Sequence, residues 1–489
     1  MGRGIAQLFA AGGFNALIFD LDEGLVGDAI AHAASMLERD ASKGKINRDA
    51  AVAGRARLKP ASTIKALSSA DIFIEAIVEE IAAKREFITA LEATIAPSCV
   101  IATNTSSSLV TANAAHAKHP GCICGMHFFN PVPLMKVVEI IGGARTRTNT
   151  IQTAKSFVAA TGHAAVVAGD MPGFLVNHAG RGLYTEGLRI VSEGIAAIDD
   201  VDLVMRESAG FRMGPFELLD LTGLDVSYKV TTQIYHQFFE DPRYRPQPLA
   251  ARQYAAGLHG RKVIEGFYRY VDGKAVVSPK LRPMRSEARP VWMASSLDEY
   301  GQRVRDRLNE LGINLKQGDV PDAGSIILVA PVGNDAMTTA VMGKLDPERT
   351  VAIDPLFCES DRITFMTTPV TRPEYRDSAC NLLTDAGLQV TSIHDSPGFI
   401  AQRVIAMIVN IGCDMAQQRI ASPKDIEIGV KLGLGYPAGP LGLGDRIGSR
   451  TILTILERMF AFYGDPRYRP SPWLKRRATL GCPLTTEEV

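Results

Sequence analysis

The stretch from Thr103 to Glu139 constrains the fold of this chain more than any other. Residues 104–108 form a polar cluster after one apolar run, and His127 follows another. In an α/β domain both places are the carboxyl ends of strands, where open parallel sheets place their sites. Ser106, His127 and Glu139 are therefore expected to meet at one sheet edge, as a hydrogen-bonding group, an acid/base and a carboxylate that orients the base.

A single histidine near a strand end is more often a satisfied structural residue than a catalytic one. The neighbours of His127 favour function. Phe128, Phe129, Pro131 and Pro133 form a rigid apolar wall around one titratable group, and such a wall excludes water.

Three sequence blocks together resemble the 3-hydroxyacyl-CoA dehydrogenase family. They are Asn-Thr-Ser-Ser at 104–107, His-Phe-Phe-Asn-Pro at 127–131 and Asp-x-Pro-Gly-Phe-x-Val-Asn at 170–177. They stand in the family's order and at its spacing. The resemblance covers at least residues 1–272, and a weaker form of it returns after residue 391.

The resemblance implies NAD-dependent oxidation of a (3S)-3-hydroxyacyl-CoA thioester to the 3-oxoacyl-CoA. His127 is the implied base and Glu139 the carboxylate that fixes its tautomer. Ser106 is expected to hold the reacting oxygen, and Asn177 to stabilise the substrate oxygens as charge shifts. Asn130, beside the histidine, is assigned to the substrate as well.

The implied cofactor residues lie at the ends of several predicted strands. Asp20 ends the strand predicted over residues 14–20, where the family carries the acid that bonds the adenosine ribose, which favours NAD over NADP. Glu79 and Lys84 match positions on the nicotinamide side, and Asn104 is assigned to the cofactor too. For Glu79 and Lys84, a helix N-terminal charge and a surface residue are the structural alternatives.

The chain starts within the expected dinucleotide-binding unit. Residues 1–13 predict a helix that the family places after a first strand and Gly-x-Gly, and Gly2 resembles the third glycine, which allows close helix–strand packing. Two interpretations of the missing strand remain. The intact remainder of the site favours a start placed too late, and a true loss of the cofactor site is the other.

A basic turn separates two helices predicted between residues 24 and 68. It contains Lys43 and Lys45. The family uses this region for CoA, and a lysine suits a phosphate as a point charge. We assign Lys43 to the substrate's CoA phosphates, and a solvated helix end is the alternative.

The predicted fold class is α/β, with a Rossmann-type dinucleotide-binding domain whose first strand is missing. Duplicated all-α helical domains follow, with a small degenerate α/β domain between them. The predicted boundaries are 1–168 for the NAD-binding domain, 169–274 for the first helical copy, 275–300 for a linker, 301–392 for the degenerate domain and 393–489 for the second copy.

The duplication follows from motifs that recur at an offset of 225 residues (395 − 170). Asp395-Ser-Pro-Gly-Phe repeats the block at Asp170, and Gly439-Pro repeats Gly214-Pro. Gln402 replaces Asn177 and no second His-Phe-Phe-Asn-Pro exists, so the copy is not a second active site. Since shorter family members pair such domains across a dimer, we predict intramolecular pairing of the two copies, with a homodimer open.

Composition limits the remaining classes. With 53 basic and 53 acidic residues the net charge is zero, which gives no nucleic-acid footprint. Seven cysteines in 489 residues indicate reduced thiols, and only Cys122 and Cys124 lie close together, too few for a metal site. No apolar run reaches membrane-spanning length, and no signal peptide pattern is present. The expected location is cytoplasmic.

The sequence leaves the acyl group of the substrate undetermined. The duplicated half resembles bacterial enzymes of phenylacetate breakdown that oxidise 3-hydroxyadipyl-CoA, and also 3-hydroxybutyryl-CoA enzymes. Arg145, Arg147 or Arg212 could meet a terminal carboxylate. Two other classes remain, a non-catalytic structural relative and a hydroxy-acid dehydrogenase that does not use CoA.

Overall fold

The computed structural model describes residues 1–277, 285–295, 297–316 and 318–488. The chain divides into two compact units, each made of two segments: Met1–His178 with Gln418–Gly435, and Ala179–Gln417 with Tyr436–Val489. The first unit therefore contains the predicted dinucleotide-binding domain and, in addition, a segment of the second helical copy.

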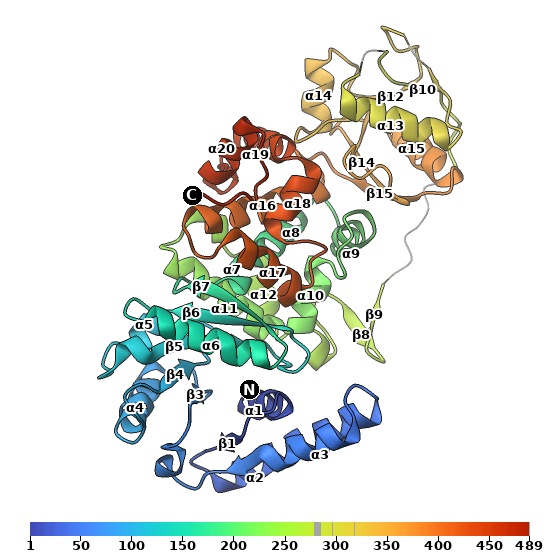
Figure 1. Ribbon diagram of the computed structural model, residues 1–489. Coiled ribbons are helices and arrows are strands. Elements are labelled where there is room, and N and C mark those ends of the chain that lie inside the picture. The colour runs from blue at the N-terminus through green and yellow to red at the C-terminus, as the bar shows by residue number, and fades with distance from the viewer. Residues whose placement is uncertain (278–284, 296, 317, 489) are drawn as a thin grey trace. The chain divides into compact units, whose positions relative to one another are not determined.

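A five-stranded sheet lies at the centre of the first unit (Figure 1). In spatial order its strands are β3 (Ile72–Glu75), β4 (Val100–Thr103), β5 (Ile123–Phe128), β6 (Val137–Gly142) and β7 (Ala164–Gly169). All neighbours are parallel except β5 and β6, which are antiparallel. All six residues of β5 are buried, because both faces of such a sheet are covered.

Helices accompany this sheet along the chain. They are α4 (Ile81–Glu92), α5 (Val110–Asn113) and α6 (Thr148–Ala160). The N-terminal helix α1 (Gly2–Ala11) contributes Ile5, Leu8 and Phe9 to the core that includes Val138 and Ile140 of β6. The helix predicted over residues 1–13 and the α/β character of this domain are thus confirmed.

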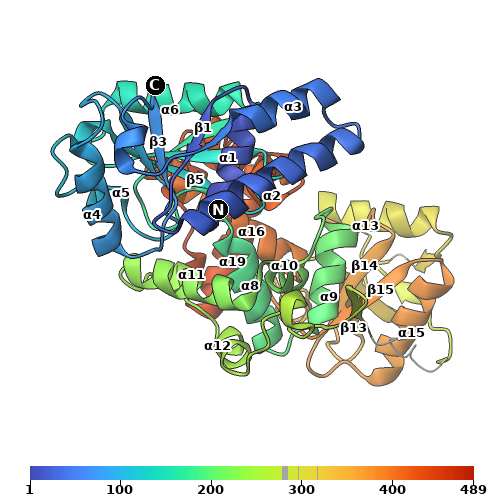
Figure 2. The same ribbon diagram turned by 90° about the horizontal axis from the view of Figure 1, so that it is seen from below.

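The remaining strands of the first unit form a separate two-stranded sheet. In it β1 (Ala16–Ile18) pairs in parallel with β2 (Leu58–Pro60), and neither strand pairs with β3 in the described residues. Two helices, α2 (Glu23–Ser42) and α3 (Arg48–Arg57), connect them and lie side by side (Figures 1 and 2). The basic turn lies between these helices, as predicted.

Most of the helices that follow belong to the second unit. Those of the first copy are α8 (Arg181–Ser192), α9 (Ile198–Leu203), the π-helical turn η3 (Val204–Ser208), α10 (Pro215–Thr222), α11 (Leu224–Gln237) and α12 (Pro248–Ala255). Those of the second copy in this unit are α16 (Ala401–Gln417), α18 (Pro440–Ile447), α19 (Ser449–Tyr463) and α20 (Pro472–Leu480).

The two helical copies pack on each other through α8 and α16. Arg403 of α16 donates to Glu186 of α8 at 2.7 Å, and Arg467 lies 2.9 Å from the same carboxylate. All three side chains are fully buried. A buried carboxylate with two guanidinium partners fixes how the copies meet, because removing either partner would leave uncompensated charge. The predicted pairing within one chain is confirmed.

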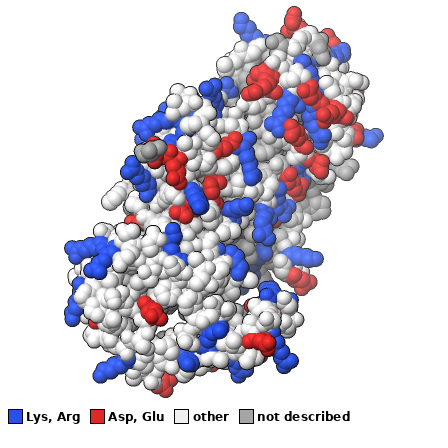
Figure 3. All heavy atoms as spheres, in the orientation of Figure 1, with Lys and Arg blue, Asp and Glu red and all other residues white. Residues whose placement is uncertain are grey.

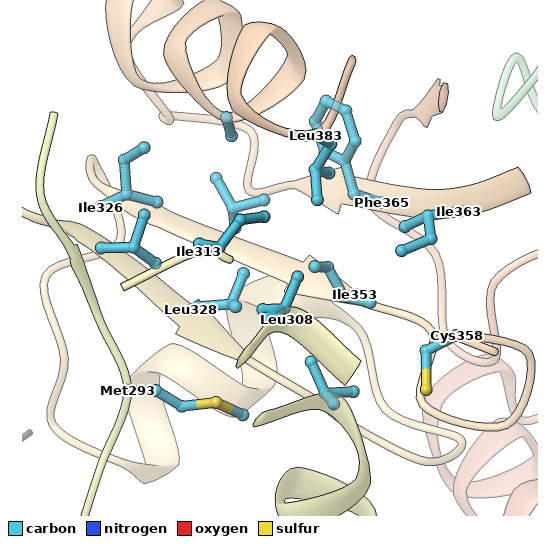
Figure 4. Close-up of a cluster of buried hydrophobic side chains, with 14 of the residues drawn as sticks. Met293, Leu308, Ile313, Ile326, Leu328, Ile353, Cys358, Ile363, Phe365 and Leu383 are labelled. Carbon is cyan, nitrogen blue, oxygen red and sulfur yellow. The ribbon is translucent and has the colours of Figure 1, made fainter. Parts of the chain in front are cut away.

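A second α/β sheet lies between the two helical copies in sequence. Its order is β11 (Leu315–Lys316), β10 (Val291–Trp292), β12 (Ile326–Val329), β13 (Thr350–Ile353), β14 (Arg362–Thr367) and β15 (Gln389–Ile393). The helices α13 (Glu299–Glu310), α14 (Ala336–Met342) and α15 (Pro373–Asp385) accompany it. As in the first sheet, one strand pair, β13 and β14, is antiparallel. Figure 4 shows Leu308, Ile326 and Phe365 in its buried apolar core.

The offset of 225 residues extends into this sheet. β14 and α15 start at Arg362 and Pro373, and β6 and α6 start at Val137 and Thr148. The same offset therefore relates elements of the two α/β domains, in agreement with a degenerate α/β domain between the helical copies.

The predicted linker at 275–300 is wrong for part of its length. β10 and the first residues of α13 fall inside it, while residues 278–284 and 296 lie outside the described residues. A two-residue strand has no period for a sequence pattern to detect. The N-cap of α13 is Asp298, an acid at the place where a dinucleotide-binding domain presents its phosphate loop.

Charged residues of both signs are interspersed over the face seen in Figure 3, in keeping with the zero net charge. Within the described residues, no helix combines the length and apolar character that crossing a membrane requires. The seven cysteines are free thiols.

Candidate active site

A histidine and a glutamate face each other across two antiparallel strands of the first unit. His127 of β5 pairs in register with Glu139 of β6, and its Nδ1 lies 2.5 Å from Glu139 Oε2. The histidine is 6% exposed and the glutamate 0%. With Nδ1 engaged by a carboxylate, Nε2 is left to act on a ligand, which is how an orienting carboxylate prepares a base.

The second carboxylate oxygen of Glu139 is fixed as well. Oε1 accepts the backbone N–H groups of Leu175 at 2.9 Å and Val176 at 2.8 Å. These residues lead into α7 (Val176–Ala179), so the carboxylate takes the place of a helix N-cap. A proline suits the first turn of a helix, but Pro172 precedes α7, because the chain makes a turn through Phe174 and the helix starts after it. Asn177 is the second residue of α7.

Aromatic rings line the histidine. Its ring centroid lies 4.5 Å from that of Phe129 and 5.7 Å from that of Phe174. Phe174 is buried and comes from the repeated Pro-Gly-Phe block rather than from the histidine block. The apolar wall predicted from the sequence therefore includes a residue 47 positions away.

The polar loop after β4 lies at the same sheet edge. β4 runs parallel to β5, with Thr103 opposite Gly125, and Asn104 Oδ1 accepts the N–H of Phe128 at 2.9 Å. Asn104 thus ties the loop to the residue after His127. Ser106, two positions further on, is half-buried. The sheet therefore places the serine loop and the histidine at the same edge.

Glu79 organises this loop. Its Oε1 accepts from the hydroxyl of Thr105 and, at 3.0 Å, from that of Ser107. Burial alone would raise its pKa, but the hydrogen bond from Thr105 and the charge of Lys84 outweigh burial, so the pKa of Glu79 is lowered. The carboxylate of Glu79 therefore stays ionised, and it holds the serine loop through these two hydrogen bonds.

Lys84 is fully buried rather than a surface residue. Its Nζ lies 3.0 Å from both oxygens of Glu75 and 3.2 Å from Glu79. Thr103 donates to Glu75 at 2.6 Å. Sequence reasoning missed Glu75 and Thr105. The two acids at the end of the strand, Glu75 and Glu79, were the available signal, because a buried acid needs a partner.

The cofactor end of the unit presents groups that suit a dinucleotide. Asp20 is exposed at the end of β1, with one oxygen accepting the N–H of Asp22 at 3.2 Å. α1 starts at Gly2 with no acid in its first turn, so its leading N–H groups can donate to a phosphate. A Cβ added at Gly2 would meet only Ala76 Cβ, at 4.0 Å, so the close packing predicted for this glycine is not found.

A cavity of about 530 Å³ lies between the N-terminal helices and the loop after β5. Lys43 and Lys45 line it from the basic turn, and Arg3 and Arg39 add two further cations. Asn130 lines it from the other side. The structure therefore brings together Lys43 and Asn130, the two residues that the sequence assigns to the substrate from separate motifs.

The second α/β domain shows what the same positions become without this chemistry. The N–H of Asp354 donates to the carbonyl of Thr364 at 3.1 Å, which continues the register of β13 and β14. These two residues therefore stand where His127 and Glu139 stand in the first sheet. Gln402 replaces Asn177 and donates to Asp354 at 2.8 Å. Its oxygen accepts the N–H of Gly333 at 2.7 Å. Gln402 and Asp354 are both buried.

A histidine held by a carboxylate at the edge of a dinucleotide-binding sheet is the arrangement of an NAD-dependent dehydrogenase. The profile of the NAD binding domain of 3-hydroxyacyl-CoA dehydrogenase matches residues 1–171. The profile of the C-terminal domain of 3-hydroxyacyl-CoA dehydrogenase matches residues 173–270 and again 398–486, which confirms the duplication.

Individual relatives agree. The 3-hydroxyadipyl-CoA dehydrogenase of Escherichia coli K12 is 31% identical over 98% of this chain and 96% of its own length. The 3-hydroxybutyryl-CoA dehydrogenase of Bradyrhizobium diazoefficiens is 35% identical over 56% of this chain and 94% of its own. The crystal structure of the 3-hydroxybutyryl-CoA dehydrogenase of Escherichia coli K12 matches with a TM-score of 0.85, 31% identity and coverage of 98% and 96%.

The chain belongs to the 3-hydroxyacyl-CoA dehydrogenase family. The predicted family, the Rossmann-type fold with helical copies, the NAD cofactor and the enzyme class are confirmed.

Proposed function

We propose that His127 is the base of this 3-hydroxyacyl-CoA dehydrogenase and that Glu139 orients it. The observation that carries the proposal is the buried pair itself, with Nδ1 2.5 Å from Oε2 and the other carboxylate oxygen held by two backbone N–H groups. A histidine locked in this way has one tautomer and one free edge, which is what general-base catalysis needs.

His127 Nε2 takes the proton of the substrate's 3-hydroxyl as the C3 hydride leaves. NAD, when bound, supplies the acceptor for that hydride. The imidazolium that forms lies against the Glu139 carboxylate, which stabilises its charge in a water-poor site. The rings of Phe129 and Phe174 exclude water around it. The protein thus accepts the proton, and the fixed orientation of the His127 ring determines that Nε2 takes it.

Ser106 and Asn177 are assigned to the oxygens of the substrate. Ser106 lies in the loop that Asn104 ties to the strand of the base. Asn177 directly follows Val176, whose N–H donates to Glu139, so the same carboxylate fixes where the backbone of Asn177 lies. Both side chains carry groups that can hydrogen-bond an oxygen on which negative charge develops.

Cofactor contacts are assigned to Asp20, Gly2, Asn104 and the Glu79–Lys84 pair. Asp20 suits the ribose hydroxyls and repels a 2′-phosphate, which supports NAD over NADP. Lys84 acts through Glu79, since both of its partners are carboxylates in the described site.

The CoA portion is assigned to the cavity lined by Lys43, Lys45 and Asn130. Its four cations suit the phosphates of CoA, and its proline-rich wall suits the apolar pantetheine arm.

For the acyl group we propose first 3-hydroxyadipyl-CoA and second 3-hydroxybutyryl-CoA as alternatives that substrate comparison has to separate, because relatives of both names align with 98% of the chain at 31% identity. A role in phenylacetate catabolism depends on the first choice. Arg147 does not support a carboxylate subsite, because its backbone N–H donates to the carbonyl of Gly121 just before β5 begins, at the end of that strand away from His127.

NADH absorbance tests the proposal with three substrates: 3-hydroxyadipyl-CoA, 3-hydroxybutyryl-CoA and CoA-free 3-hydroxybutyrate. Turnover of the thioesters alone supports the proposed reaction, and the larger kcat/KM selects the acyl group. Equal turnover of the free acid would favour a CoA-independent dehydrogenase. NADH binding without turnover of any of them would favour a structural relative.

We also propose a cytoplasmic enzyme, which the seven free thiols support, since they match a reducing compartment. Whether the chain forms a homodimer is decided by analytical ultracentrifugation.

A further inference from the structure

The second helical copy contributes one helix to the catalytic unit. Helix α17 (Pro423–Leu434) belongs to the same compact unit as the five-stranded sheet and contacts β6 and β7 (Figure 1). Just before it, the carbonyl of Ile420 accepts the N–H of Gly169 at the end of β7, at 2.6 Å. The segment 418–435 is therefore part of the structure that carries His127 and Glu139.

The contact is reciprocal. In the second unit, the carbonyl of Ile195 accepts the N–H of His394 at 3.0 Å, which is the Ile420–Gly169 pair shifted by 225 residues. The helix that follows Ile195 ends in η3, where Ser208 donates to the carbonyl of Arg362 on β14 at 3.0 Å. The second helical copy thus packs a helix on the first sheet, and the first helical copy packs a helix on the second sheet. The catalytic pair lies in the first sheet.

Two glycines of α17 face the segment that holds Glu139. A Cβ built on Gly429 would lie 2.5 Å from Leu175 Cδ2, and one built on Gly433 would lie 2.8 Å and 2.9 Å from the two γ-methyls of Val176. Leu175 and Val176 are both 0% exposed, so their side chains have little room to move away. Val176 is β-branched and has the stiffer side chain.

These two residues donate the N–H groups that bind Glu139 Oε1. The side chains of Leu175 and Val176 pack against α17, and their backbone N–H groups hold the Glu139 carboxylate. At the equivalent positions of the other helix, 225 residues earlier, stand Val204 and Ser208 rather than glycine. The glycines therefore occur in the copy of the helix that backs the catalytic segment and not in the copy that backs the degenerate sheet.

We propose that Gly429 and Gly433 are positioning residues for the active site, and that the second helical copy is retained in the chain because α17 holds the Leu175–Val176 backbone against Glu139. This inference rests on the proposed role of the His127–Glu139 pair. It gives the duplicated half a task in the reaction although its own site has lost the catalytic residues.

The test uses the full chain with Gly433→Ala. Alanine favours a helix more than glycine does, so a loss cannot come from helix propensity. The added methyl pushes Val176 and its N–H away from Glu139, and a shift of about 1 Å is expected to lower kcat between about 10- and 100-fold. KM for NAD and for the thioester should stay within about twofold, because ground-state binding is untouched.

Three companion variants make the result specific. Gly433→Ala combined with Val176→Ala removes the clash and should restore most of kcat. Gly429→Ala should have a smaller effect, because the leucine side chain it meets is more flexible. Lys431→Ala, exposed on the same helix, should match the wild type.

Hydrogen exchange of the peptide containing Leu175 and Val176 gives a readout independent of turnover. Gly433→Ala should speed exchange of these amides, and the double variant should slow it again. Wild-type exchange and wild-type kcat in Gly433→Ala would overturn the inference. If exchange responds as expected but the wild type turns over no 3-hydroxyacyl-CoA, the positioning contact stands and the proposed function fails.

Discussion

Glu139 lies directly opposite His127 in the antiparallel ladder of β5 and β6, with 2.5 Å between Oε2 and Nδ1. The pair is therefore set by backbone register as well as by side-chain packing. A slip of one residue would turn one partner to the other face of the sheet, so the fold specifies the pair strongly.

Replacing His127 with alanine removes the proposed base. We expect kcat to fall on the order of 10²–10⁴-fold, which is what a positioned general base contributes. NADH should still bind, because the cofactor groups at Asp20 and the helix α1 N-terminus are untouched. Stopped-flow turnover and NADH fluorescence titration measure the two effects. Retained turnover would refute the base assignment.

Glu139→Gln tests the tautomer argument. The amide oxygen can still accept from Leu175 and Val176, which leaves the amide NH₂ facing His127 Nδ1. Nδ1 must then accept, so Nε2 carries the proton and cannot take another. A loss of roughly 10²–10⁴-fold in kcat at unchanged melting temperature is expected, as for similar carboxylate-to-amide changes. Glu139→Asp, which keeps the charge, should lose less.

The sheet-edge site could be predicted from the sequence because its parts are strand-end motifs. Ser106 follows β4 and His127 lies near the end of β5, and parallel strands deliver such ends to one edge. Glu139 reaches that edge differently, near the start of β6, because β6 is antiparallel to β5. The duplication was visible for a similar reason, since Asp170 and Asp395 both bond to helix N-termini, at Val110 and Ala336, and both copies keep that acid.

The contacts that hold the site residues in place could not be predicted in the same way. The role of Lys84 depends on burial against Glu75, which its spacing does not encode. The contact of α17 with Leu175 joins residues more than 240 positions apart, and a glycine in a helix gives no hint of its partner. The start of α7 cannot be read from the local sequence either, because the side chain that caps it, Glu139, comes from a distant strand.

Lys43 and Lys45 are expected to act in binding alone. Changing both to alanine removes two of the four cations of the cavity. KM for the acyl-CoA should rise roughly 5- to 50-fold, in line with about 1–2 kcal/mol of charge-assisted contact, while kcat and KM for NAD stay the same. Increasing salt should reduce the difference between variant and wild type. A matched exposed change, Lys65→Ala, should leave all three constants unaltered.

Lys84→Met should destabilise the first unit strongly. It removes the cation from Glu75, whose carboxylate is fully buried, and from Glu79. Breaking a buried pair in this way costs about 3–5 kcal/mol, because one charge stays behind without its partner. Denaturant unfolding measures the loss. Adding Glu75→Gln to the same chain removes the stranded charge and should recover part of the stability. A double variant less stable than Lys84→Met would contradict this explanation.

Asp354 makes the stability of the second unit depend on pH. Burial raises its pKa to about 7. Between the unfolded value near 4 and about 7, the folded chain therefore binds more protons than the unfolded chain, so this carboxyl contributes less to stability as pH rises. Asp354→Asn cannot ionise but can still accept from Gln402. We expect the variant to gain on the order of 2 kcal/mol over the wild type between pH 5 and pH 8. Urea unfolding at both pH values measures the gain, with the exposed Asp361→Asn as control. Curves that stay parallel for variant and wild type would show that Asp354 is ionised in the folded chain throughout this range.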